Sequence, residues 1–108
     1  MVDGHVTEVH ASEIHAREMH ARSIVADAHV DTLDALLRTK KTMSEGATGG
    51  HVNRAFLKEG GVDLLVTAMF TDPIFRPEGT MHRVMQMADL FWRTCDDPDF
   101  FPVQSRSD

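Results

Sequence analysis

The chain has 108 residues with 11 basic and 17 acidic side chains, which gives a formal net charge of −6 at pH 7 with histidine neutral. This acidic balance excludes a tight, non-specific grip on nucleic acid, because the phosphate backbone repels it. The length allows one small domain at most. The single cysteine, Cys95, excludes an internal disulfide framework and is typical of a reducing compartment.

No apolar stretch approaches the roughly 20 residues that a membrane-spanning helix requires. The longest candidate, residues 62–70, also contains Asp63 and Thr67. The N-terminus lacks the basic and apolar regions of a secretory signal. These features predict a cytoplasmic protein without a membrane span.

A five-residue repeat occupies residues 5–24 and places four histidines at equal intervals. They are His5, His10, His15 and His20. On an α-helix a step of five residues turns the side chain by about 140°, so the four point in different directions and cannot share one metal ion. Glu13 precedes Arg17 at the spacing of a helical ion pair, and the next repeat has the same arrangement. Residues 1–22 are therefore predicted as an exposed helix with incidental histidines.

From residue 23 on, the spacing of apolar residues along the chain changes. Residues 23–31 alternate between apolar and polar side chains, which predicts a strand, and residues 32–40 carry leucines at helical spacing. Residues 43–50 contain glycine and predict a loop. Residues 52–59 predict a short helix that the pair Gly60-Gly61 closes.

Residues 62–70 form a near-continuous apolar run, typical of a parallel strand buried on both faces. Residues 80–95 predict an amphipathic helix, and its apolar stripe is expected to face the core. The stripe consists of Met81, Val84, Met85, Ala88, Phe91, Trp92 and Cys95. Ser107 and Asp108 would suit the N-cap of a further helix. The order strand, helix, strand, helix predicts an α/β fold with a parallel sheet.

The chemistry is concentrated in Asp27, His29 and Asp31. Side chains two apart on a strand share a face, so the His29 imidazole and the Asp31 carboxylate are expected within about 5 Å of each other. Ala28 and Val30 are expected to pack beneath helices on the opposite face. Burying the three polar side chains without a cation would cost several kcal/mol, and a divalent metal removes that cost. Zinc accepts this ligand set readily, and iron or manganese are alternatives.

A His-x-Asp tripeptide by itself also fits a polar strand end without any ligand. Its place at the C-terminal end of a first strand favours the metal site, because α/β enzymes put their chemistry at that edge. His51 and His82 have no carboxylate at ligand spacing and are predicted as surface residues.

Two segments carry a resemblance to a known family. Residues 25–33 read Val-Ala-Asp-Ala-His-Val-Asp-Thr-Leu, and residues 51–62 read His-Val-Asn-Arg-Ala-Phe-Leu-Lys-Glu-Gly-Gly-Val. They are similar to D-G-H-N-D-T-L and H-V-D-L-P-R-L-R-E-G-G-V of the membrane dipeptidase family, the renal dipeptidase-like metallopeptidases. These are zinc-dependent (β/α)8 TIM-like barrels of the amidohydrolase-like kind.

The resemblance implies that residues 23–108 form the first βα units of such a barrel, which is incomplete here. It implies that His29 and Asp31 bind one of two zinc ions, while Asp27 orients or supports them. Ala28 and Val30 depart from the family pattern between the ligands and not at them. The resemblance covers only the first third of a family member, so the bridging glutamate and the histidines of the second zinc cannot be assigned.

The resemblance therefore predicts a hydrolase that cleaves the peptide bond of dipeptides with a metal-activated water, and a 108-residue fragment that is inactive alone. No catalytic acid or base can be named, and homo-oligomers are left open. Two alternatives remain: a non-enzymatic remnant or interaction module of two βα units, and another metal-dependent hydrolase of the amidohydrolase type.

Overall fold

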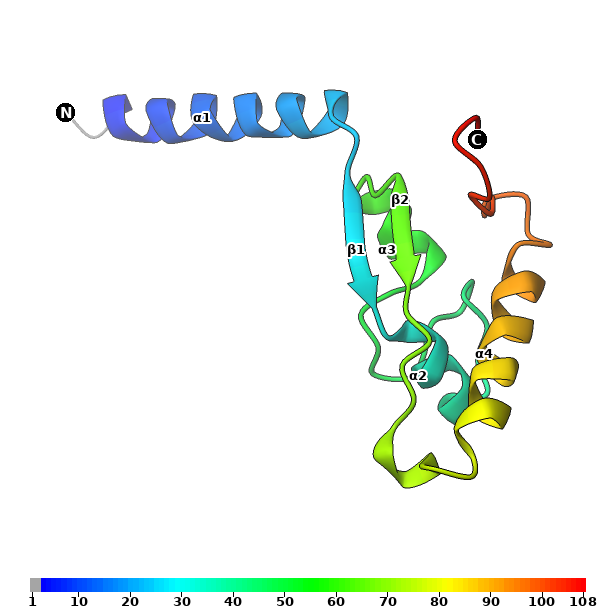
Figure 1. The fold of residues 1–108 in the computed structure, drawn as a ribbon. Coiled ribbons are helices and arrows are strands. Elements are labelled where there is room, and N and C mark those ends of the chain that lie inside the picture. The colour runs from blue at the N-terminus through cyan, green and yellow to red at the C-terminus, as the bar shows by residue number, and fades with distance from the viewer. Residues whose placement is uncertain (1–2) are drawn as a thin grey trace.

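The computed structural model describes the backbone of residues 3–108 and the side chains of residues 10–108. Figure 1 shows helices and strands in one mixed α/β chain. In order they are α1 (Asp3–Arg22), β1 (Ala26–Val30), α2 (Thr32–Thr39), α3 (Arg54–Glu59), β2 (Leu64–Thr67), a 3-10 turn (Pro73–Phe75) and α4 (Thr80–Thr94). Each predicted helix and strand is present in the expected order. None of the described helices is long and apolar enough to cross a membrane.

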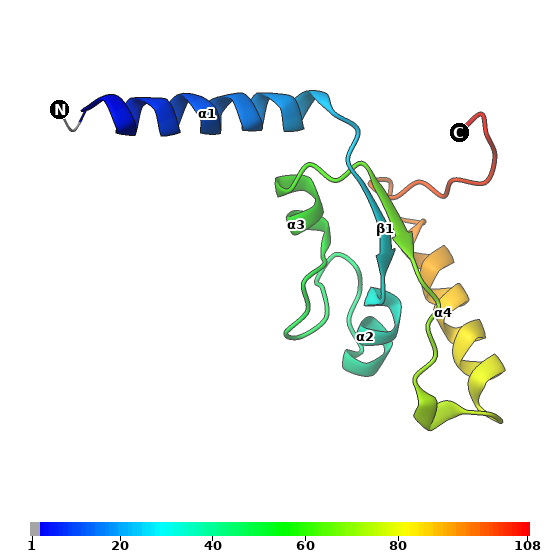
Figure 2. The same cartoon turned by 60° about the vertical axis from the view of Figure 1, so that its left-hand side comes forward.

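Helix α1 extends away from the other elements as a rod (Figures 1 and 2), which makes the molecule 67 Å long and only 22 Å thick. Its side chains from residue 10 to 22 are exposed, as the repeat predicts. The predicted ion pair is present, with Arg17 Nη2 2.7 Å from Glu13 Oε1. A helix that is polar on every side has no face to bury, so α1 packs on nothing along most of its length.

The carboxyl end of α1 is attached to the end of α3. His20 Nε2 donates a hydrogen bond to the Gly60 carbonyl oxygen, at 2.6 Å. Gly61 follows with φ of 64°, in the left-handed region that favours glycine. A Cβ at Gly61 would lie 3.1 Å from His20 Nε2. The prediction that all repeat histidines are incidental is thus wrong for His20, which joins two helices.

Strands β1 and β2 pair in parallel, with Ala26 opposite Leu64 and Asp27 opposite Leu65. The prediction that residues 62–70 are buried on both faces is wrong: the strand covers only 64–67, and Leu64 and Val66 are 41% and 47% exposed. Ala28, expected beneath a helix, is exposed as well. The reason is that the sheet has two strands in the part of the chain described, and the helices pack on each other instead.

The hydrophobic core lies between α2, α4 and the loop that joins α2 to α3. Its fully buried members are Leu33, Leu36, Met43, Met87 and Leu90. The leucines of α2 face the methionine and leucine of α4, and Met43 closes the space from the loop side. The core is thus a helix–helix contact beside the sheet and not a layer over it.

The predicted stripe of α4 meets the core only in part. Val84 and Phe91 pack against the core, whereas Met81, Met85 and Trp92 are exposed. Arg83 and Met87, which the stripe leaves out, are buried at the i, i+4 spacing. The helix carries apolar side chains on two opposite sides, and only one side meets α2. An apolar periodicity cannot reveal that a charged residue belongs to the buried face.

Arg83 is buried with a charged partner, Asp34, on one side and an aromatic ring, Phe75, on another. Its Nη2 lies 2.7 Å from Asp34 Oδ1, and its Nε lies 3.1 Å from the same oxygen. The guanidinium also lies over the Phe75 ring, 4.7 Å from the centroid. Arg38 contacts the other carboxylate oxygen of Asp34 at 2.9 Å. This network joins the first turn of α2 to α4.

The chain after α4 folds back onto the loop and α3. Asp97 accepts hydrogen bonds from Arg54 at 2.6 Å and from Ser44 at 3.3 Å. At the end of the chain, Asp108 accepts the backbone N–H groups of Gln104 and Ser105. These contacts close a turn within the last five residues.

Candidate metal site

The candidate metal ligands lie where β1 passes into α2. Strand β1 ends at Val30 and α2 begins at Thr32, so Asp31 occupies the N-cap position between them. His29 Nε2 and Asp31 Oδ1 are 3.0 Å apart. The predicted proximity within 5 Å is thus present, although Asp31 lies one residue beyond the strand.

The Asp31 side chain does not cap α2, although aspartate is common at the N-cap position. An N-cap aspartate accepts a backbone N–H from the first turn, a contact worth about 1 kcal/mol. The Asp31 side chain makes no such bond, and its carboxylate lies against the imidazole of His29 instead. An exposed contact of this kind stabilises a protein by about 0–1 kcal/mol. The Asp31 backbone, at φ −93° and ψ 24°, is not in the extended conformation of a capping residue, so the start of α2 has no side-chain cap.

Asp27 contacts the backbone of His29. Its Oδ1 accepts the His29 backbone N–H at 3.0 Å, so it holds the strand next to the imidazole. This contact fits the supporting role that the resemblance implies for Asp27.

The site is open to solvent. The side chains of His29 and Asp31 are 64% and 55% exposed. The prediction of a closed site, in which three polar groups need a cation to offset their burial, is wrong. The case for a metal therefore depends on the geometry of the donors and not on their desolvation.

The two donors fit one zinc ion. Tetrahedral zinc with bonds of about 2.0–2.2 Å holds neighbouring ligand atoms about 3.3–3.5 Å apart. The separation of 3.0 Å between His29 Nε2 and Asp31 Oδ1 reaches that value with a small side-chain rotation. Among the residues that the structure describes, no group of three histidine, cysteine, aspartate or glutamate side chains lies together. The pair would therefore supply at most half of a tetrahedral coordination shell.

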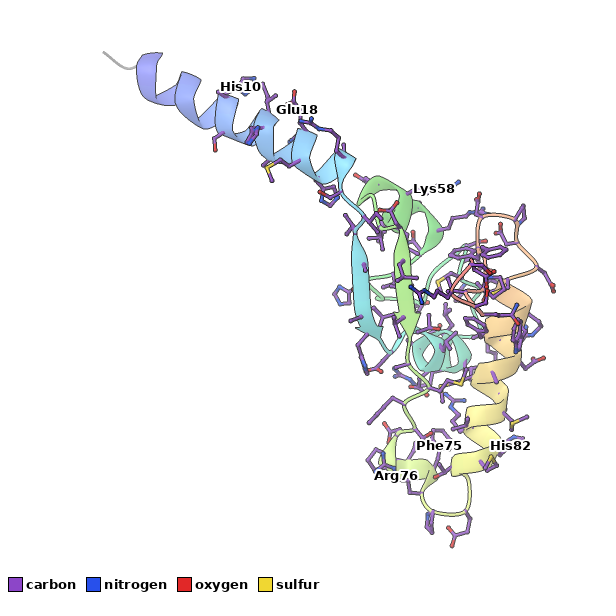
Figure 3. All side chains as sticks on the ribbon, turned by 45° about the horizontal axis from the view of Figure 1, so that its top comes forward. His10, Glu18, Lys58, Phe75, Arg76 and His82 are labelled. Carbon is purple, nitrogen blue, oxygen red and sulfur yellow. The ribbon has the colours of Figure 1, made fainter. Side chains whose placement is uncertain are left out.

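The remaining histidines lie elsewhere. His10 and His15 are exposed on α1, and His51 and His82 are exposed at the surface as predicted (Figure 3 labels His10 and His82). The side chain of His5 lies outside the described residues. The repeat histidines whose side chains are described do not meet at one point, as the five-residue step predicts.

Two other features do not add to the site. A cavity of about 190 Å³ is lined by Met43, Leu90 and Phe100 among others, at the carboxyl end of α4 and away from His29. Burial raises the pKa of the Cys95 thiol, which disfavours the reactive thiolate.

Compared with protein-family models, with curated proteins and with solved structures, the chain has no match. The relationship to membrane dipeptidases thus stays a prediction from two sequence segments.

Proposed function

We propose that His29 and Asp31 supply the first half of a zinc centre in a dipeptidase, within the first βα units of a (β/α)8 barrel. The observation that carries the proposal is the proximity of two groups that can bind zinc: Asp31 Oδ1 lies 3.0 Å from His29 Nε2 where β1 passes into α2.

Each residue of the site has a task in this proposal. To bind zinc, His29 Nε2 would give up the proton that it directs at Asp31 Oδ1 and offer its lone pair, and the Asp31 carboxylate would add negative charge that offsets the metal. Asp27 keeps the His29 backbone in place through its 3.0 Å hydrogen bond. When bound, zinc would activate a water molecule and polarise the scissile carbonyl of a dipeptide.

The chain alone should bind zinc weakly and should not hydrolyse dipeptides. Catalytic zinc sites use three protein ligands and structural sites four, whereas the described residues bring two together. The other ligands, and any second zinc, would have to be held by residues outside the described group.

Zinc titration of residues 1–108 by calorimetry tests the proposal. We expect one equivalent to bind, and we expect affinity to fall at least about tenfold in His29→Ala and in Asp31→Asn, since each removes one of two ligands. His82→Ala is the matched control, because it deletes an equally exposed imidazole and should leave affinity unchanged. Zinc binding that survives both site variants would contradict the proposal, as would binding lost only when His10, His15 and His20 are replaced.

A dipeptide hydrolysis assay with added zinc tests whether residues 1–108 are active without the remaining ligands of the proposed zinc centre. The expected result is no turnover by residues 1–108. Turnover that disappears in His29→Ala would contradict the predicted inactivity and would show that chains complete the site together. Absence of any zinc binding would favour the non-enzymatic interaction module.

A further inference from the structure

We propose that Arg83 is a positioning residue for the candidate zinc site: it holds the first turn of α2 and thereby sets where the Asp31 carboxylate lies relative to His29. This role rests on the proposed function, since it concerns the same two ligands. Three observations support it: the contacts of Arg83 with Asp34, the burial of the residues that link Asp34 to Asp31, and the location of Arg83 between the two segments that follow the strands.

One guanidinium contacts both the side chain and the backbone of Asp34. Arg83 Nη2 and Nε donate to Asp34 Oδ1 at 2.7 and 3.1 Å, and Nη2 also donates to the Asp34 carbonyl oxygen at 3.4 Å. The two side chains are only 10% and 12% exposed, so salt and water screen the contact little. Because the guanidinium is planar and its donors form a fixed fork, these contacts set the orientation of Asp34 as well as its position.

The residues that link Asp34 to Asp31 are buried and helical. Thr32, Leu33 and Asp34 are 8%, 0% and 8% exposed, and all three belong to the first turn of α2. The exposed Asp31 comes directly before them and makes no side-chain bond to the helix. Since no local capping bond fixes Asp31, its position depends on the tertiary contacts of the turn that follows it.

Arg83 also contacts the segment that follows the second strand. Its guanidinium lies 4.7 Å from the centroid of the Phe75 ring, which belongs to the 3-10 turn after β2 (Figure 3). Helix α2 follows β1 in the same way. Arg83 therefore joins the segments that leave the carboxyl ends of both strands, and α/β enzymes place their ligands at this edge of a parallel sheet. All of these partners lie within residues 34–83, so the arrangement does not depend on any further strand.

Stability alone does not require a charged pair at this place. Replacing a buried ion pair by apolar side chains of similar volume often leaves a protein equally stable or makes it more stable. A guanidinium fork on a carboxylate adds direction, because its hydrogen bonds allow one arrangement of the two groups. A metal site needs such direction, since its ligands must be held within about 0.5 Å of the productive geometry.

The double variant Asp34→Leu/Arg83→Met separates positioning from stability. It removes both charges together, so it should keep most of the urea midpoint of the wild-type chain. Its affinity for zinc in calorimetry should fall about tenfold, the lower end of the loss expected when groups that orient metal ligands are removed. The backbone order parameters of residues 31–33, measured by NMR relaxation, should fall below the rigid value of about 0.85.

Met87→Ala is the matched control, because Met87 is buried on the same face of α4, four residues after Arg83. This variant should lower the urea midpoint and leave zinc affinity unchanged, which is the reverse of the double variant. Arg83→Lys is a second test that keeps the buried charge and loses the fork. Its zinc affinity should also fall, by less than in the double variant.

Wild-type zinc affinity and order parameters in both Arg83 variants would overturn the positioning role, and so would an equal loss of affinity in Met87→Ala. The zinc centre itself fails in a different way. Zinc binding that His29→Ala and Asp31→Asn do not weaken contradicts the zinc centre, whereas binding that depends on those ligands but not on Arg83 contradicts only the positioning role. Where the wild-type chain binds no zinc, the order parameters of residues 31–33 still decide whether Arg83 holds the turn.

Discussion

The sheet β1–β2 is no less apolar in sequence than the helix pair α2–α4, yet the helices bury their apolar side chains much more completely. Leu33, Leu36 and Met87 are fully buried between the helices, whereas Leu64 and Val66 remain more than two-fifths exposed on the sheet. The two helices each present a stripe that the other can cover. A two-stranded sheet has two faces and two edges, and neither strand can cover the faces. Apolar sequence therefore predicts the need for burial but not whether a partner is present.

The candidate site lies at the junction between these two regions. His29 belongs to the exposed strand, whereas Asp31 begins the helix whose first turn is held by the Asp34–Arg83 contact. The buried contact thus fixes one ligand, while the other stays on the more open element.

The largest expected effect is at the buried ion pair that joins the helices. Asp34→Ala leaves the Arg83 charge buried without its partner, which should lower the free energy of unfolding by about 3–5 kcal/mol. Urea denaturation measures the loss. Adding Arg83→Met should recover much of it, because no unpaired charge then remains. A loss below about 1 kcal/mol for Asp34→Ala would show that solvent reaches the pair.

The next largest effect compares a leucine of the helix–helix core with a leucine of the sheet. Leu36→Ala should cost about 2–5 kcal/mol, since it opens a cavity in the helix–helix core. Leu64→Ala should cost a smaller amount, because that leucine is already 41% exposed. Equal losses of the two variants in urea denaturation would contradict the difference between the two regions.

The third prediction tests whether the contact between His29 and Asp31 contributes to the stability of the fold. His29→Ala removes only an exposed contact with Asp31, so the free energy of unfolding should change by less than about 1 kcal/mol while zinc binding is lost. His51→Ala is the matched control, because that exposed histidine is not next to an N-cap aspartate. A clear loss of stability in His29→Ala would mean that its contact with Asp31 is structural.

The smallest effect is a pH dependence at the chain end. The backbone N–H of Asp99, with Arg54 and Ser44, holds the pKa of Asp97 below its ordinary value of 3.8. A carboxyl with a lowered pKa stabilises the folded state above its ordinary pKa and loses that contribution as pH falls through the lowered value. The melting temperature should therefore fall less steeply on acidification in Asp97→Asn. Identical acid profiles would show that Asp97 contributes nothing.

Local features of the sequence determined where the helices and strands lie. Asn53 accepts the Phe56 backbone N–H and starts α3, and Gly61 ends it with a positive φ. The proximity of His29 and Asp31 was also predictable, because two-residue spacing in a nearly extended backbone is a local property. These features depend on neighbours in sequence and so can be inferred without knowing the rest of the fold.

Only the tertiary structure decided which of these surfaces are buried. Arg83 is part of the core because Asp34 and Phe75 reach it from other elements, and His20 joins α1 to α3 through a carbonyl 40 residues away. The exposure of the sheet, and of the candidate ligands His29 and Asp31, depends in the same way on what packs against them. Burial requires contact between segments that lie far apart in the sequence. A pattern of apolar residues describes only one of those segments and does not identify the other.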